Sequence, residues 1–544
     1  MMRAFIPLMR RLSFLALLAT ALFATGCAKR ETPAEEGLRT HTLLIGNQNE
    51  PGTLDPQIYD AATDYNVIGA LFEGLTSYDE KTATAVPGVA ERWEISADGL
   101  VYTFHLRANA RWSNGDRVTA RDFAWSFQRF ITPALGNSYA YYFYPVRGAE
   151  TFATGKTKDF STVGVAVIDD LTLRVTLDRP TAYFLGILAT SALPVHRASV
   201  EAAGRFDDRN SPWAKPGKLI GNGAFTLVEW QPSARIVVTK NPYYWNAAQN
   251  HLERVMFYPI EKADAEELAF RAGQLHVTYS VPPSKLATYR STAPEKLRID
   301  PLLQLYFVNF NATKTPLDNP KVRRALTLAL DRAAISASVF NGARLPAHSL
   351  VPPNCGGYTG PAGQTEDYAA ARALLAEAGY PGGHGLPSLP MQVLNDDKVP
   401  RVAEVIQALW RRELGVQITL EPYDQKTWIQ NRQNLTHVLS VQGWTADFPD
   451  PIGFLDMFHT GNGSNVFGWS NHDYDALLDQ AARTADRGER FALLRKAEAL
   501  MLDDAAVAPL AFGARTYLIH PAVKNWESAP LGIHRYQLIE LKAP

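Results

Sequence analysis

Apolar and polar residues alternate at several places along the chain, and this pattern predicts β-strands. Apolar residues occupy every second position over 101–107, 171–177 and 416–420, as in strands with one buried face. A short apolar run at 43–45, bounded by turn-forming residues, also predicts a strand. The strands are spread over the whole chain rather than gathered in one part.

The second half of the chain carries the period of amphipathic helices. Asp-Asn-Pro at 318–320 is a start signal, because proline suits the first helical position, and apolar residues follow it at helical spacing. Further helices are predicted over 369–378 and around 402–410, and the capping-box spacing of Thr119 and Asp122 predicts another in the first half. Helices followed by strands predict α/β lobes in which helices cover sheets.

The first 27 residues have the features of a secretory signal. Arg3, Arg10 and Arg11 precede an apolar run over 12–23, and small residues precede Cys27. The run is too short for an ordinary transmembrane span, and no later stretch is long and apolar enough for one.

The segment Ala24-Thr25-Gly26-Cys27 resembles a bacterial lipobox, with Ala24 where leucine is usual. The resemblance implies that Cys27 becomes an acylated N-terminus and anchors the chain to a membrane, in the periplasm or at the cell surface. The alternative is an ordinary signal peptide with a chance cysteine. The polar residues that follow, with Pro33 and Gly37, predict a flexible tether over 28–40.

The composition narrows the class of protein. A chain of 544 residues exceeds what one core usually organises, so we expect several lobes. The net charge of -1 excludes the basic footprint of a nucleic-acid-binding protein. Aromatic residues make up 11%, which suits a binding cleft or an aromatic-rich core. If Cys27 is modified, Cys355 has no intrachain partner, and we expect no disulfide framework. We also expect the protein to be a monomer.

The sequence motifs that would indicate catalysis are absent or incomplete. It contains no H-E-x-x-H, C-x-x-C or G-x-S-x-G motif. Residues 155–157 imitate the end of a P-loop, but Glu150 stands at its first glycine position. Residues 221–223 begin like a dinucleotide fingerprint, but Thr226 stands at its third glycine position. The histidines show no close metal-ligand spacing. We therefore expect no enzyme activity, no metal and no cofactor.

Several segments, taken together and in order, resemble the extracytoplasmic oligopeptide-binding proteins of ABC importers (solute-binding family 5). They are Leu54-Asp55-Pro56-Gln57 with Leu71-Phe72-Glu73-Gly74-Leu75, Pro87-Gly88-Val89-Ala90-Glu91-Arg92-Trp93, 98–123, Gly221-Asn222-Gly223-Ala224-Phe225 with Asn241-Pro242-Tyr243-Tyr244-Trp245, 318–326, and Gly443-Trp444-Thr445-Ala446-Asp447-Phe448-Pro449-Asp450-Pro451. The resemblance covers nearly the whole chain after the signal.

The resemblance implies an α/β, two-lobed periplasmic-binding-protein-like fold of type II, with an extra inserted domain and a ligand cleft between the lobes. The expected domains are a signal peptide and tether followed by a discontinuous lobe I, an inserted domain II and a lobe III. Their expected bounds are 1–27 and 28–40 for the signal and tether, 41–61, 196–302 and 514–544 for lobe I, 62–195 for domain II, and 303–513 for lobe III.

The resemblance also implies a site for extended peptides. Asp447 matches the family's aspartate that binds the ligand ammonium, and a charge-assisted hydrogen bond of this kind is strong. A turn residue is the alternative for Asp447, and Asp450, directly before Pro451, fits a turn better. Arg432 stands where relatives carry an arginine that faces the cleft, and a surface arginine is its alternative.

Backbone pairing supplies the rest of the implied site, because strand addition does not depend on ligand sequence. The matching positions are Gln442, Gly443 and Trp444 on one side, and the segment from Glu50 to Thr53 on the other. Trp444 is a pocket wall or an ordinary core residue. Glu50 is a cleft residue or a solvated loop residue.

The implied function is capture of short oligopeptides and their delivery to a membrane ABC transporter, through closure of the lobes around the ligand. Rivals within the family are binders of dipeptides, murein peptides, haem, nickel chelates or sugars. Rivals from other classes are a secreted hydrolase, and a lipoprotein with a signalling or chaperone role. At two positions near Asp447 the chain departs from some relatives: Val441 replaces an arginine, and Thr445 replaces a cysteine.

Overall fold

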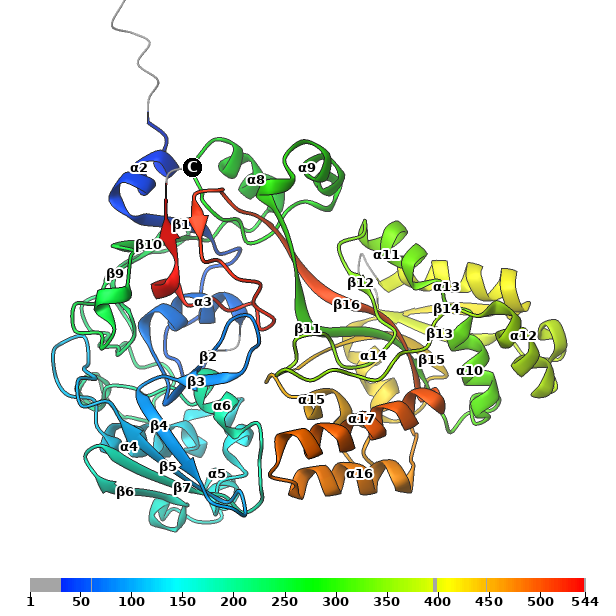
Figure 1. Cartoon of the computed structure of the whole chain (residues 1–544), viewed down its shortest axis with the longest axis horizontal. Coiled ribbons are helices and arrows are strands. Elements are labelled where there is room, and N and C mark those ends of the chain that lie inside the picture. The colour runs from blue at the N-terminus through cyan, green and yellow to red at the C-terminus, as the bar shows by residue number, and fades with distance from the viewer. Residues whose placement is uncertain (1–30, 60, 395–398, 447, 543–544) are drawn as a thin grey trace, which may run out of the picture.

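The computed structural model describes residues 31–59, 61–394, 399–446 and 448–542. The described chain forms two halves, each built of helices and sheets, and two long strands pass between them (Figure 1). These crossing strands are β11 (Leu297–Phe310) and β16 (Val507–Leu518), which pair with each other antiparallel.

One sheet of the left half in Figure 1 has the order β1-β10-β9-β8. Its strands are β1 (Thr42–Gly46), β10 (Arg254–Tyr258), β9 (Arg235–Lys240) and β8 (Phe225–Gln231). β1 is parallel to β10, and the other pairs are antiparallel. Helix α3 (Ala62–Leu71) packs into the same core, which also takes Tyr517 from the end of β16 and Ile519 directly after it. The predicted strand at 43–45 is confirmed as β1.

A second sheet of the left half has the order β4-β5-β7-β6 and lies at its lower end in Figure 1. Its strands are β4 (Ala90–Ile95), β5 (Val101–Leu106), β7 (Thr172–Thr176) and β6 (Val165–Asp169). Helix α4 (Ala120–Phe130) covers it and begins at the predicted capping box of Thr119 and Asp122. A hairpin of β2 (Thr76–Tyr78) and β3 (Ala85–Pro87) joins this sheet to the first.

The sheet of the right half has the order β12-β16-β11-β15-β13-β14. The strands not yet named are β12 (Leu345–Pro346), β15 (Leu439–Thr445), β13 (Leu389–Leu394) and β14 (Ile418–Tyr423). One face packs on α10 (Pro320–Leu328), α11 (Arg332–Phe340), α12 (Tyr368–Glu377) and α13 (Val399–Leu414). The other face packs on α16 (His472–Arg483) and α17 (Arg487–Asp503). The predicted helices and the strand near 416–420 are confirmed.

The remaining short elements connect these layers. They are α5 (Ala149–Ala153), α6 (Phe184–Thr190), α7 (Arg197–Ala202), α8 (Ala263–Arg271), α9 (Leu286–Thr292), α14 (Gln425–Gln433), α15 (Ile452–Leu455), β17 (Val523–Lys524) and β18 (Glu540–Leu541). In the part of the chain that is described, no helix has the length and apolar character that a bilayer crossing requires.

The crossing strands change register where they leave one half for the other. In β11, the residues from Leu297 to Pro301 pair with those from Leu518 back to Ala514 in β16. Pairing then resumes at Leu305, which lies opposite Phe512. Gly513 sits at this irregularity, and a methyl group added to it would lie 2.6 Å from the Cβ atom of Gln304. The two halves are therefore connected by an irregular double strand, which is a suitable place for a hinge.

The N-terminal segment is more ordered than its composition indicates. The prediction of a flexible tether over 28–40 is wrong for its second part, which forms α2 (Pro33–Thr40). Thr32 and Glu35 form a capping box, and the amide of Ala34 donates to the Gly273 carbonyl oxygen at 2.8 Å. These contacts dock α2 onto the left half. The expected domain bounds otherwise stay a prediction.

His276 ties α2 to β1 from inside the left half. The side chain is fully buried, its Nδ1 accepts the amide of Leu44 at 3.0 Å, and its Nε2 lies 3.0 Å from the carbonyl oxygen of Ala34. A neutral ring with its proton on Nε2 satisfies both partners. Burial lowers the pKa of His276 to about 4.

Acid is expected to weaken this attachment. An unfolded histidine titrates near pH 6.5, so the contribution of His276 to stability is complete above that pH and is lost as the pH falls towards 4. The full shift corresponds to about 3 kcal/mol of unfolding free energy. Chemical denaturation of the wild type and of His276→Gln at several pH values measures it, since the variant should show the shallower decline. Parallel curves for the two proteins would contradict the assignment.

Candidate functional site

Strand β15 carries the segment that the sequence assigned to ligand binding, and one of its edges is partly unpaired. The strand pairs with β11 along its whole length, from Leu439 opposite Phe310 to Thr445 opposite Gln304. On the other side β13 pairs with Leu439 and Ser440 alone among the described residues. The backbone beyond Ser440 therefore presents a one-sided edge, which an extended chain can pair with.

The three predicted residues on this edge differ in exposure. Gln442 is buried, and its Oε1 accepts a hydrogen bond from Arg432 Nη1. Gly443 is exposed, and a Cβ atom there would lie 3.2 Å from the ring of Tyr306. Trp444 is half-buried, and its Nε1 donates to the carbonyl oxygen of Gly453 at 2.7 Å. The structure thus brings Gln442 and Arg432 together and ties the Trp444 ring to α15 through Gly453.

Arg432 is a half-buried cation on α14. Its guanidinium lies over the Trp428 ring, with the Cζ atom 3.6 Å from the ring centroid. Burial lowers the pKa of Arg432 to about 10, and no ion pair among the described residues includes it. A desolvated guanidinium without a counter-charge attracts an anion.

A layer of buried polar groups lies between α14 and the sheet. Its members share the property that a buried nitrogen or oxygen has no hydrogen-bond partner within the described structure: Gln392 Oε1, Trp428 Nε1, Arg432 Nε and Ser440 Oγ. Buried polar groups in proteins are nearly always paired, so this region is suited to polar guests. Burial lowers the pKa of His437 to about 4, which keeps its ring neutral at pH 7.

Glu50 and Thr53 belong to the left half and do not meet β15 in this structure. Glu50 Oε1 accepts from Trp230 Nε1, and Oε2 accepts from the amide of Ser233 at 2.9 Å. Thr53 Oγ1 accepts from the amide of Asp55 at 3.1 Å. No hydrogen bond or ion pair within the described chain joins either residue to β15, and the two segments belong to opposite halves.

Two predicted residues, Asp447 and Cys27, lie outside the described residues. The neighbours of Asp447 are placed: Ala446 donates its amide to the Leu303 carbonyl oxygen at 3.0 Å, and the Phe448 ring stacks on Tyr183 with centroids 4.1 Å apart. The turn predicted at Asp450 is present, because its Oδ1 accepts the amide of Ile452 at 3.0 Å.

Asp450 also has a role that the sequence did not reveal. Both its carboxylate oxygens accept from Arg490 of α17, each at 2.7 Å, and both side chains are nearly buried. Bidentate pairs of this kind fix geometry as well as energy. The pair holds the loop after β15 against α17.

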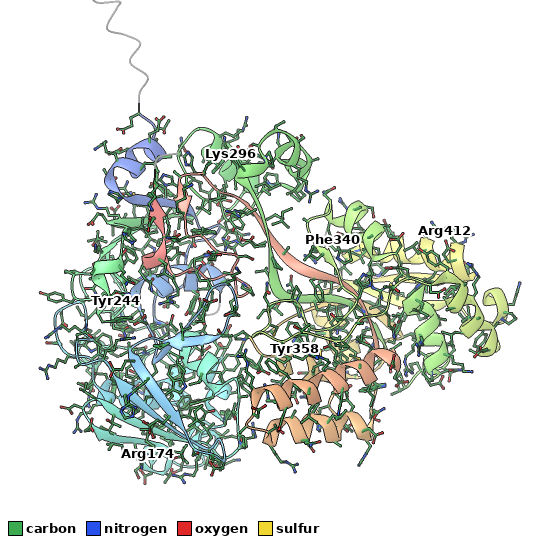
Figure 2. The ribbon with its side chains drawn as sticks, in the orientation of Figure 1. Arg174, Tyr244, Lys296, Phe340, Tyr358 and Arg412 are labelled. Atoms are coloured by element: carbon green, nitrogen blue, oxygen red, sulfur yellow. The ribbon has the colours of Figure 1, made fainter. Side chains whose placement is uncertain are left out.

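Other motif residues form similar buried joints in the left half. The Glu73 carboxylate accepts from Tyr244 Oη at 2.7 Å and from Trp245 Nε1 at 2.6 Å. Burial raises the pKa of Glu73, and both donors act against that rise. Tyr244, labelled in Figure 2, lies inside this half. These motif residues build the scaffold around the site.

The chain belongs to a known family of binding proteins. The family described as bacterial extracellular solute-binding proteins, family 5 Middle, matches residues 84–465. The class defined by the two halves and the strand edge is therefore that of a solute-binding protein.

Two curated relatives show the range of solutes in the family. The chain is 33% identical to the periplasmic oligopeptide-binding protein OppA of Salmonella typhimurium, over 93% of this chain and 94% of that protein. It is 34% identical to the probable deoxycholate-binding periplasmic protein YgiS of Escherichia coli, over 91% and 92% respectively.

A solved structure confirms the fold class. The murein tripeptide binding protein MppA in its unliganded open form superposes with a TM-score of 0.85 at 29% identity, covering 92% of this chain and 97% of that chain. A second MppA structure, from Escherichia coli, gives 0.71 at 30% identity. The two-lobed α/β fold is thus confirmed, and the chain superposes better on the unliganded open form of MppA than on the second MppA structure.

Proposed function

We propose that this protein is a lipid-anchored extracytoplasmic receptor that binds short peptides and delivers them to an ABC importer. The one-sided edge of β15 carries the proposal, because it offers main-chain hydrogen bonds that suit any peptide sequence. The oligopeptide named in OppA and the murein tripeptide named in MppA support this ligand class.

In this proposal the charged ends of the peptide are held by separate groups. Asp447 binds the ammonium at one end of the strand edge. Arg432, half-buried and without a counter-charge among the described residues, attracts the carboxylate at the other end. Gln442, Gly443 and Trp444 pair with the peptide backbone between them.

Closure of the halves completes the proposed site. Glu50 and Thr53 lie on the opposite half, and the irregular crossing of β11 and β16 permits a hinge movement. A peptide that contacts both halves binds the closed form more tightly and shifts the equilibrium towards it.

Attachment through Cys27 would place the body of the protein close to the membrane. Because α2 begins at Pro33, the chain between Cys27 and the cap residue Thr32 is short. Five residues reach at most about 17 Å even when fully extended. The proposed anchor is therefore joined to the folded body by a short linker, and it keeps the receptor near a membrane-bound importer.

Calorimetry with Ala-Ala-Ala and its N-acetylated form tests the proposed function. The free tripeptide should bind and be recovered intact, while the acetylated form should bind at least about 100-fold more weakly, because it lacks the ammonium. Native mass spectrometry of the purified protein should show short peptides. Deoxycholate binding without peptide binding would overturn the proposal in favour of the solute named in YgiS, and cleavage of the peptide would favour a hydrolase.

A further inference from the structure

Apart from the crossing strands, a contact between α9 of the left half and the end of α11 joins the two halves. Arg290 of α9 donates from Nη1 to the carbonyl oxygen of Asn341 at 2.6 Å and from Nη2 to that of Gly342 at 2.8 Å. Asn341 is the left-handed residue that ends α11, so the guanidinium meets the negative end of the helix dipole. We refer to Arg290 and residues 341–343 as the Arg290 clasp.

Ala343 adds an apolar contact to the Arg290 clasp. It packs against a buried cluster of the left half that includes Leu286 and Tyr289 of α9. The next residue, Arg344, is held in the right half, where its Cζ atom lies 3.7 Å from the ring centroid of Tyr306. Each side of the clasp is therefore fixed to its own half, and the clasp resists a relative movement of the two.

The Arg290 clasp and the free edge of β15 lie on opposite sides of the crossing strands. In the sheet order β12-β16-β11-β15, β12 begins two residues after the clasp, whereas β15 lies beyond β11. Figure 1 shows α9 and α11 above the crossing strands, and Figure 2 shows Phe340, the last residue of α11, on that same side. A rotation about the crossing strands that closes the halves over β15 therefore separates the two sides of the clasp.

We propose that the Arg290 clasp is a lock that holds the ligand-free halves apart and thereby limits the affinity for peptides. This inference rests on the proposed function. While the clasp is formed, Glu50 and Thr53 make no hydrogen bond to β15 among the described residues. A contact that must break when the halves close stabilises the ligand-free arrangement, and the apparent affinity for a ligand of the closed form falls accordingly.

Replacing Arg290 by Ala tests the lock. We expect Arg290→Ala to bind Ala-Ala-Ala about three- to tenfold more tightly than the wild type, because a charged donor no longer holds the halves apart. Arg290→Lys keeps a cation that can reach one carbonyl oxygen, so its gain should be smaller. Calorimetry measures the affinities, and a thermal melt verifies the fold. Damage to the binding site would weaken binding, so a gain in affinity reports the balance between the two arrangements.

Lys285→Ala is the matched control, because Lys285 is an exposed cation next to α9 that is not part of the Arg290 clasp. It should leave the affinity unchanged. Equal or weaker binding of Ala-Ala-Ala by Arg290→Ala than by the wild type would overturn the proposal. If the wild type does not bind Ala-Ala-Ala, the proposed function fails, and small-angle scattering of the ligand-free proteins decides on the lock. Arg290→Ala should then be more compact than the wild type, and an equal radius of gyration would overturn the lock as well.

Discussion

Replacing Asp447 by Asn is expected to weaken the binding of short peptides with a free N-terminus by about 100- to 5,000-fold. The ammonium of a bound peptide is removed from water when the halves close. Without a carboxylate partner it remains a desolvated charge, which costs about 3–5 kcal/mol. The substitution keeps the size of the side chain, so the loss reports the charge.

A double-mutant cycle isolates this interaction. Calorimetry on the wild type and Asp447→Asn, each with Ala-Ala-Ala and N-acetyl-Ala-Ala-Ala, gives four affinities whose coupling measures the contact. We expect acetylation to weaken binding strongly in the wild type and little in the variant. Additive effects of the two changes would show that Asp447 and the ammonium do not meet.

Replacing Asp55 by Ala is expected to lower the unfolding free energy by about 3–5 kcal/mol. Asp55 Oδ2 accepts from Arg129 Nη2 at 2.6 Å and from Trp213 Nε1 at 3.0 Å, and Oδ1 accepts from Arg129 Nη1 at 3.1 Å. Arg129 is fully buried, so the variant leaves its charge inside the left half without a counter-ion.

Denaturation in urea measures the change, with a surface pair as the control. Asp170 pairs with Arg121 at 3.3 Å, and both side chains are largely exposed. Asp170→Ala should therefore leave stability essentially unchanged. If Asp55→Ala were as stable as this control, the buried pair would not be a support of the fold.

The sequence predicted the helix starts that depend on residues close together in the chain. The start of α10 follows from Asn319 and Pro320, and the start of α4 from Thr119 and Asp122. The capping box of α2 was equally visible as Thr32 and Glu35, but the polar composition around it indicated a tether. What fixes α2 is contact with Gly273 and His276, which lie far away in the sequence.

The residues of the candidate site were predicted only through the resemblance to a family. The contact of Arg432 with Gln442 and the one-sided edge of β15 depend on the path of β13, which no spacing encodes. The stacking of Tyr183 on Phe448 was not predicted, because the two residues come from different halves and meet through the fold. The sequence predicted a turn at Asp450. It did not predict the ion pair with Arg490, which lies on a helix far along the chain.

The position of β16 in the chain has a consequence for biosynthesis. This strand inserts between β12 and β11 in the sheet of the right half, and the residues after it complete the core of the left half. Neither half can finish folding until nearly the last residue has left the ribosome. A chain made in this order acquires the final form of both halves only when its synthesis is almost complete.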